Sequence, residues 1–395
     1  MNVAPASPSA RRVFAGAFTA TFITFLGVGA VVPALPRYVT GPLGAGEIAV
    51  GIVMGSFAFT AVVLRPVGGR LSDRRGRRTV AVTGATLTAI AGCIYLLPLD
   101  IPGLILARLI LGVGEGWLYT ASAAWVVDVT PEERRGETIG IFGMSIWLGL
   151  SLGPPIGEAL RAIGGYDLVW AFAAVAPAIG AVIAYRTPED KLALPRADST
   201  EHQDLLPRGA LLPGLALGCA VIGFAAMQGF VILMLEDRNV AHGATVFTAF
   251  AVAVAVTRFV LSWLPDRIGA ERTAAIAAVG HATGLSILAL AHSLPVALGA
   301  AVVQGVGYSL LFPALALLAV QRVDEQSHGA ALGFFTAFFD AGMGLGAPLA
   351  GAMAVVLGYT GMFLIAAMLS LAGGLLTLTG MGAKVVPQTG SATGA

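Results

Sequence analysis

The chain has 395 residues, of which 57% are hydrophobic and 11% are charged, and its formal net charge is +1. A soluble domain carries about 25% charged residues, so this composition excludes an ordinary soluble protein and indicates a polytopic membrane protein. The sequence contains no P-loop signature and no cluster of His and Cys residues. We therefore expect neither ATP nor a metal ion to serve as a cofactor, and the basic residues give no sign of a nucleic-acid partner.

Apolar stretches long enough to cross a hydrocarbon core of ~30 Å as helices recur along the whole chain. They are continuous rather than alternating in polarity, which favours helices over a membrane β-barrel. The first stretch lacks a clean signal-peptide cleavage site, so we expect it to be retained as a span. The sequence predicts twelve spans, over residues 13–35, 47–69, 79–97, 102–124, 138–160, 168–186, 210–235, 243–264, 273–291, 295–319, 329–354 and 360–381.

The lysines and arginines between these spans predict the orientation, because cytoplasmic loops carry an excess of both. A cytoplasmic N-terminus places seventeen of the 23 basic residues inside and three outside, and the remaining three, Arg65, Arg108 and Arg258, lie within spans. We therefore expect a multi-pass protein of the cytoplasmic (inner) membrane with both termini in the cytoplasm.

An internal repeat divides the chain. When residues 65–166 are shifted forward by 193 positions they fall without a gap on residues 258–359. Charged, Pro and Tyr residues are matched in this single register. Matches between glycines alone would not establish the repeat, because glycine is frequent in the chain. The matched positions include Arg65 with Arg258, Asp73 with Asp266, Arg74 with Arg267, Gly76 with Gly269, Pro155 with Pro348, and Gly165-Tyr166 with Gly358-Tyr359.

The repeat and the span count predict an all-α integral membrane protein of two pseudo-symmetric six-helix bundles. We expect an N-terminal bundle over 1–186, a polar cytoplasmic linker over 187–209, a C-terminal bundle over 210–384, and a disordered tail over 385–395. Parallel repeats related by an axis along the membrane normal are one of the plans of secondary transporters, in which substrate binds between the halves.

The loop between spans 2 and 3, Gly69–Arg78, reads GRLSDRRGRR. It resembles the G-x-x-x-D-R-x-G-R-R/K signature of the major facilitator superfamily, and residues 263–269 hold a degenerate copy. In that family the loop latches the two halves in the outward-facing state, although the arginines could serve only as positive-inside anchors. The resemblance implies a latch made of Gly69, Asp73, Arg74, Gly76, Arg77, Asp266, Arg267 and Arg65.

Span 4 holds an Arg and a Glu, Arg108 and Glu115, seven residues apart on one helical face. An Arg within a span is costly unless it is paired or faces water, so it suggests a functional site. The segment Leu106–Gly116 also resembles the second signature of the family, whose Arg is associated with proton coupling in drug antiporters. Glu115 is our candidate for binding the proton or a cationic substrate group, and the alternative is a structural neutralisation of Arg108. In this fold Glu115 and its repeat counterpart Tyr308 are expected to face each other.

Span 5 carries closely spaced Gly and Pro residues, which allow helices to approach and bend. The segment resembles the antiporter signature G-x-x-x-G-P-x-x-G-G, which separates exporters from importers in the family. Glu158 stands in place of the last glycine, and it is also three residues from Arg161, so it could simply form a pair with that residue. The candidate positions of the signature are Gly149, Gly153, Pro154, Pro155 and Gly157.

Asp340 is the lone carboxylate of span 11, about 16 Å deep by the helical rise. It could cycle a proton, or it could form a structural bridge to Arg65, because spans 2 and 11 pack together in this fold. His281 is expected to be a packed or lipid-side residue. Candidates for the substrate cavity are the aromatic and amide side chains of Trp117, Tyr119, Phe224, Gln228, Gln304 and Tyr308.

Together these resemblances imply a secondary active transporter that is not an enzyme and that uses the proton gradient rather than a cofactor. We expect a monomer in the lipid bilayer that exports a small organic molecule, a drug (multidrug resistance) or a metabolite, by proton-coupled antiport with alternating access. The nearest alternative is an importer or facilitator of a sugar or organic acid, and a remote one is a membrane enzyme or sensor that transports nothing.

Overall fold

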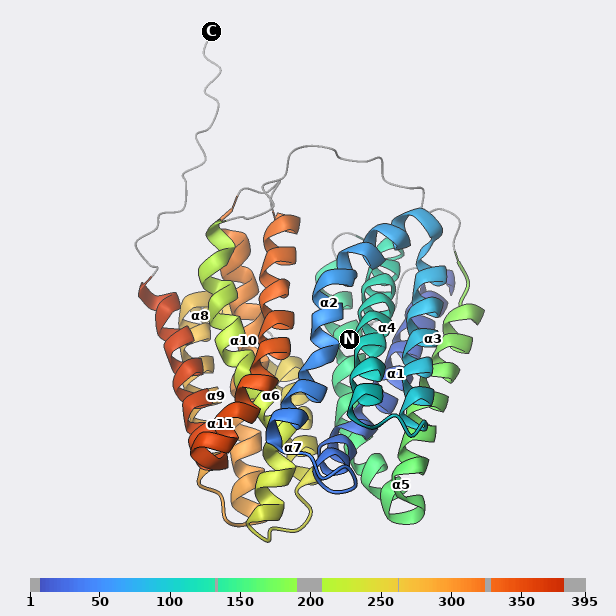
Figure 1. Ribbon diagram of the computed structural model, residues 1–395. Helices are drawn as coiled ribbons and strands as arrows, with labels where there is room; N and C mark the ends of the chain where they lie inside the picture. Colours follow the sequence, from blue (N-terminus) through green and yellow to red (C-terminus); the bar gives the residue numbers. More distant parts are fainter. Residues whose placement is uncertain (1–7, 132–133, 190–207, 262, 324–327, 380–395) are drawn as a thin grey trace.

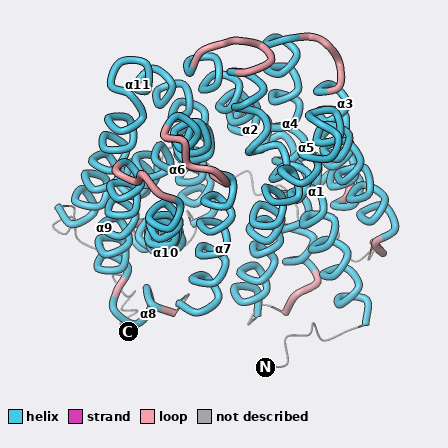
Figure 2. The backbone as a smooth tube through the Cα atoms, turned by 90° about the horizontal axis from the view of Figure 1, so that it is seen from below, coloured by secondary structure: helices cyan, strands magenta, loops and turns pink. Residues whose placement is uncertain are grey.

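The computed structural model of the protein describes residues 8–131, 134–189, 208–261, 263–323 and 328–379, and these residues contain helices and no strand. The helices form two bundles that lie side by side (Figure 1). Seen from below, α1 to α5 group on one side and α6, α7, α9, α10 and α11 on the other (Figure 2). The expected fold class, two six-helix membrane bundles, is confirmed.

The N-terminal bundle is made of five helices, the last of which crosses the bundle twice. That helix, α5, is broken where Gly164 and Gly165 leave helical geometry. The two arms of α5 correspond to predicted spans 5 and 6. The bounds are α1 Pro8–Thr40, α2 Glu47–Arg75, α3 Arg77–Tyr95, α4 Asp100–Asp128 and α5 Arg135–Arg186.

The C-terminal bundle repeats this plan. Its last helix, α11, is broken at Gly358 and supplies predicted spans 11 and 12. Predicted span 8 ends earlier than expected, because the chain leaves the helix and forms a separate five-residue helix, α8. The bounds are α6 Leu211–Asp237, α7 Ala244–Leu261, α8 Leu264–Ile268, α9 Ala270–Ala289, α10 Leu294–Gln321 and α11 His328–Thr379, with a short 3₁₀ turn, η2, at Arg208–Ala210.

Eight of the described helices are long and apolar enough to cross a membrane. Two of these, α5 and α11, are the broken helices that cross twice. The remaining spans, 3 and 9, are α3 and α9, which are only 19 and 20 residues long and begin with charged residues. The described residues therefore account for all twelve predicted spans.

The backbone itself carries the repeat. Gly76 has φ 92° and ψ 148°, and its counterpart Gly269 has φ 90° and ψ 146°. Gly165 and its counterpart Gly358 have φ values of 69° and 67°. Because residues with a side chain rarely adopt such positive φ values, the matched glycines set the same turns in both copies.

The most extensive contacts between the bundles are those of α2 with α11 and of α5 with α7, and α1 also contacts α6. The repeat relates these two contacts to each other, since α2 corresponds to α7 and α5 to the first arm of α11. We call the end of the molecule with the turns at Gly76 and Gly269 the motif end. The opposite end, where α1 and α6 terminate, is the Arg37 end.

Candidate functional site

The centre of the α2–α11 contact is an ion pair between the bundles. Arg65 Nη2 on α2 lies 3.3 Å from Asp340 Oδ1 on α11. The Asp340 side chain is 6% exposed and that of Arg65 is 29% exposed. The bridge that the packing of spans 2 and 11 suggested is therefore present, and it links residues 275 positions apart in the chain.

Glu115 lies next to this bridge on α4. A Cβ added to the adjacent Gly116 would be 3.7 Å from Arg65 Nε, so the Arg65 side chain rests on α4 beside Glu115. Glu115 is 9% exposed, and the charged groups that act on it are those of Arg108, Arg65 and Asp340. Asp340 is thus paired with Arg65 across the bundles, and Glu115 lies buried on α4, the helix that the Arg65 side chain contacts at Gly116.

Arg108 does not form an ion pair with Glu115 in the part of the chain that the structure describes. Its Nη2 instead donates to the Met54 carbonyl at 2.7 Å, and the guanidinium lies over the Phe57 ring, 4.6 Å from the centroid. Arg108 is 4% exposed. Its contacts therefore hold α4 against α2, and the Glu115 carboxylate is left without a hydrogen bond to a described residue.

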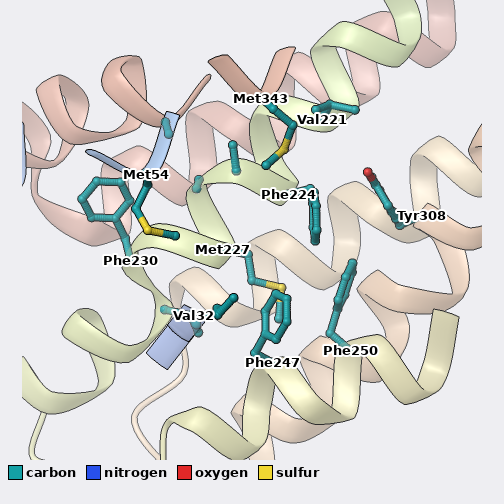
Figure 3. Close-up of a cluster of buried hydrophobic side chains, with 14 of the residues drawn as sticks. Val32, Met54, Val221, Phe224, Met227, Phe230, Phe247, Phe250, Tyr308 and Met343 are labelled. Carbon is teal, nitrogen blue, oxygen red and sulfur yellow. The ribbon is translucent and has the colours of Figure 1, made fainter. Parts of the chain in front are cut away.

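An aromatic cluster occupies the interface on the other side, built from Trp147 on α5, Phe224 on α6, Phe247 and Phe250 on α7, and Tyr308 on α10. Figure 3 shows the rings of Phe224, Phe250 and Tyr308 turned toward one another. The Phe224 and Tyr308 centroids are 5.0 Å apart, and the Trp147 and Tyr308 centroids are 6.1 Å apart. Tyr308 therefore lies in this cluster.

Arg258 of α7 points to the same cluster. Its guanidinium lies over the Trp147 ring, 5.9 Å from the centroid. Under the 193-residue repeat Arg258 corresponds to Arg65 and Trp147 corresponds to Asp340. The two inter-bundle contacts are thus built on equivalent positions, with a carboxylate in one and an indole in the other.

The Arg37 end is held together by charges and by close helix packing. Arg37 on α1 forms ion pairs with Glu158 on α5 and with Glu236 on α6, and Glu158 also receives Arg161 Nη2 at 3.3 Å. The pair with Glu236 joins the two bundles. The suggestion that Glu158 simply pairs with Arg161 was incomplete, because its second partner Arg37 places it in an inter-bundle network.

The first half of α2 packs closely on α11 at this same end. A Cβ on Gly51 would lie 2.4 Å from the Ala347 carbonyl oxygen, and one on Gly351 would lie 2.4 Å from the Glu47 carbonyl oxygen. The Tyr359 hydroxyl also donates to Glu47 Oε1 at 3.3 Å. The bundles are therefore in backbone contact at the Arg37 end.

The predicted latch residues at the motif end make contacts within one bundle. Arg77 pairs with Asp73 and, through Nε at 2.8 Å, with Asp128 at the end of α4. The Asp73 side chain is 62% exposed. Arg267 lies over the Trp263 ring, and the side chain of Asp266 is outside the described residues. In this conformation Asp73 and Arg77 join α2, α3 and α4 rather than the two halves.

The glycines of the antiporter-like signature form the face of α5 that packs on α1. Added Cβ atoms would lie 2.8 Å from Phe25 at Gly149, 2.6 Å from Gly29 at Gly153 and 2.1 Å from the Ala30 carbonyl oxygen at Gly157. Small residues four apart allow this backbone approach. Pro154 and Pro155 lie within the helix between these contacts.

The cavity candidates separate into different environments. Trp117 Nε1 donates to the Leu64 carbonyl at 2.8 Å, so this indole is a packing residue between α4 and α2. Tyr119 stacks on Phe142 with centroids 5.7 Å apart. Gln304 is fully buried, whereas Gln228 is half-buried on α6.

His281 is fully buried, which decides for the packed rather than the lipid-side alternative. Its ring nitrogens lie 3.4 Å from the Gln304 carbonyl and 3.2 Å from the Ala220 carbonyl.

Sequence reasoning missed four residues of the interface: Arg37, Glu236, Trp147 and Arg258. Arg37 and Glu236 lie at helix ends, where charged residues are common and therefore do not by themselves indicate a functional site. Arg258 and Trp147 could have been found, since the repeat aligns them with Arg65 and Asp340. The repeat aligns Arg258 with Arg65, and Asp340 had already been suggested as the partner of Arg65.

Comparisons with known proteins agree with this architecture. A family model described as Major Facilitator Superfamily matches residues 17–241 and 215–393. An uncharacterized MFS-type transporter of Salmonella typhimurium is 31% identical over 363 residues, which are 90% of this chain and 92% of that protein. An uncharacterized MFS-type transporter of Burkholderia mallei is 31% identical over 388 residues, 93% of each chain.

Solved structures show the same fold at low sequence identity. The human organic anion transporter MFSD10 (TETRAN) superposes with a TM-score of 0.74 and 18% identity, over 94% of this chain and all of that one. The nucleoside transporter NupG superposes with a TM-score of 0.77 and 14% identity, over 93% of this chain and 99% of that one. With the family model covering both bundles and curated relatives aligned over nine-tenths of its length, the chain belongs to the Major Facilitator Superfamily and is a multi-pass membrane transporter of that family.

Proposed function

We propose that this transporter exports a small organic molecule in exchange for protons, by alternating access. The observation that carries the proposal is the position of Arg65, which bridges to Asp340 of the other bundle at 3.3 Å and contacts α4 of its own bundle at Gly116, the residue after Glu115. A carboxylate that loses its charge on protonation changes the partner of such a guanidinium. The proton then controls a contact between the two halves.

We propose that Arg65 exchanges its ion-pair partner between Asp340 and Glu115. When Asp340 is ionised, Arg65 links α2 to α11. When Asp340 is protonated, a buried guanidinium without a counter-charge is strongly unfavourable, so Arg65 turns to Glu115. The α2–α11 link is then lost and the bundles are free to rock. A proton shifts the conformational balance only through its different affinity for the two states, and this exchange of partners provides that difference.

The direction of export is proposed from the predicted orientation and from the packing of the helices. The predicted orientation puts the motif end in the cytoplasm, and we propose that the molecule closed at the Arg37 end receives its substrate from inside the cell. Closure at the Arg37 end rests on Arg37, Glu158, Glu236 and the packing of α2 on α11. The glycine face of α5 on α1, whose signature is associated with exporters in the family, supports the same direction.

The experiment compares efflux in cells that lack their major endogenous exporters. Cells expressing the protein are loaded with ethidium, Hoechst 33342 or carboxyfluorescein, and retention is followed with and without a protonophore. We expect faster loss of at least one dye, abolished by the protonophore and by Asp340→Asn or Glu115→Gln. Asp167→Asn, an exposed carboxylate at the Arg37 end, is the control and retains export.

Two results would contradict the proposal. If Asp340→Asn and Glu115→Gln export as fast as the parent, the proton does not act at these carboxylates. If expression instead speeds the uptake of a compound down its gradient and the protonophore has no effect, the protein is the importer or facilitator that we considered as the alternative.

A further inference from the structure

Arg258 lies at the interface of the two bundles and has no counter-ion among the residues that the structure describes. None of the carboxylates in the described residues forms an ion pair with it, and the ionisable groups that act on it are the phenols of Tyr119 and Tyr308. Its side chain is shielded by α5, which places Trp147 against it. An arginine within a membrane span is costly unless it is paired or faces a water-filled path, and it marks a functional site.

The repeat shows what is missing. At the equivalent position of the other copy, Arg65 has Asp340 as its partner at 3.3 Å. Trp147 takes the place of that carboxylate beside Arg258. The protein therefore provides an anion, Asp340, at the contact of Arg65. At the contact of Arg258 the anion has to come from another molecule.

The charges of the interface lead to the same conclusion. Asp340 and Glu115 lie around Arg65 and Arg108, so these four charges compensate one another. Arg258 forms no ion pair with either carboxylate in the described residues, and its guanidinium lies over the Trp147 ring. With all five groups ionised, the three arginines outnumber the two carboxylates by one positive charge.

The surroundings of Arg258 are apolar and aromatic. Trp147 contacts Phe224, Phe250 and Tyr308, with ring centroids 6.1 to 6.4 Å away. The Tyr308 hydroxyl is buried, and no group of the described residues forms a hydrogen bond with it. Figure 3 shows Tyr308 beside Phe224 and Phe250 at this point of the interface. In this conformation the rings are buried against one another, so their faces and the one hydroxyl become available to an apolar body and a polar atom when the bundles move apart.

We propose that Arg258 binds the anionic group of the transported molecule and that Trp147, Phe224 and Tyr308 hold its apolar part. The substrate class is a small organic anion, a carboxylate, sulfonate or phosphate ester on an aromatic or aliphatic body. The inference rests on the proposed function, since it names the molecule exported. Export of an anion in exchange for protons moves net positive charge inward, so an inside-negative membrane potential drives it together with the pH gradient.

The test measures binding to the purified full-length protein in detergent, without any gradient. The probes are naphthalene-2-sulfonate, 2-naphthoate and phenyl phosphate, with naphthalene-2-sulfonamide and 2-naphthamide as neutral counterparts. Affinity is read from the ligand-dependent rise in Tm and from the quenching of tryptophan fluorescence. We expect at least one anion to bind, and its neutral counterpart to bind at least tenfold more weakly.

Substitutions then locate the site. Arg258→Gln should weaken anion binding roughly 10- to 100-fold, the range expected for a lost hydrogen bond to a charged group. Arg258→Lys keeps the charge and retains part of the affinity. Trp147→Phe removes most of the ligand-dependent quenching. Arg272→Gln, at an exposed arginine of the same bundle, is the matched control and binds like the parent.

The proposal is overturned if no anion binds, if the neutral counterpart binds equally well, or if Arg258→Gln keeps the affinity of the parent. Should Arg258→Gln fail to fold, the comparison of anion with neutral probe and the Arg258→Lys variant still decide. A failure of the proposed function is recognised separately, because Arg258-dependent anion binding in detergent without proton-linked efflux in cells refutes export and leaves this binding site standing.

Discussion

Breaking the ion pair between Arg37 and Glu236 should open the Arg37 end. The pair joins α1 to α6, and the Arg37 side chain is 11% exposed while that of Glu236 is 45% exposed. Exposed pairs are worth about 0.2–1 kcal/mol, and the shielding of Arg37 places this one near the upper limit. Glu236→Gln should therefore cost the closed state about 1 kcal/mol, which changes the ratio of open to closed molecules about fivefold.

Arg37→Gln should have a larger effect, because it also leaves Glu158 with Arg161 alone. Distances between spin labels provide the assay. Ile163 and Leu290, exposed at the Arg37 end of the two bundles, are changed to Cys and labelled, after replacement of the native Cys93 and Cys219. Double electron–electron resonance then reports the populations of the short and long distances.

Arg161→Gln is the matched control, since it removes a partner of Glu158 without touching the inter-bundle pair. It should leave the distance distribution close to that of the parent. The reasoning would be refuted if Glu236→Gln and Arg161→Gln behaved alike, or if Glu236→Gln enriched the short distance. Either result would mean that backbone packing of α2 on α11, rather than the charges, sets the closed state.

Two further substitutions test the packing assignments. Gly157→Val should lower the Tm by several degrees and reduce expression, because a Cβ there would lie 2.1 Å from the Ala30 carbonyl oxygen. Gly140→Val should show neither effect, because no atom of a neighbouring element lies within 4 Å of its Cβ position. Equal losses in both variants would contradict the tight contact of α5 with α1. Trp117→Phe removes the hydrogen bond to the Leu64 carbonyl and should cost about 1 kcal/mol of stability, seen as a lower Tm, while binding of an exported compound is unchanged; loss of binding would return Trp117 to the substrate site.

Much of the fold could be read from the sequence because its causes are local. A stretch of about 20 apolar residues has to be helical in a bilayer, since its backbone groups have no other partners there. The turns at Gly76 and Gly269 need positive φ, so the glycines mark them in the sequence. Prediction and structure differ at the end of predicted span 8, where α7 ends at Leu261 and the separate helix α8 begins at Leu264.

The site could be predicted only in part. Intramembrane charges such as Arg108, Glu115 and Asp340 are visible in any hydropathy profile, because each interrupts an apolar run. Their partners are visible only in part, since Arg65 was suggested for Asp340 from the packing of spans 2 and 11, whereas the bond of Arg108 to the Met54 carbonyl was not. A helix can turn about its own axis by a fraction of a turn without changing its sequence pattern, and that rotation decides which groups meet.

By itself, the sequence determined the number of spans, the two copies and the positions of their turns, because apolar length and glycine placement act within a few residues. Only the tertiary structure decided that Arg65 meets Asp340, that Arg37 joins Glu158 to Glu236, and that Arg258 meets Trp147. These pairings depend on how twelve helices are rotated and packed against each other. The repeat aligns Arg258 with Arg65 and Trp147 with Asp340, and three-dimensional packing brings each arginine to its partner between the bundles.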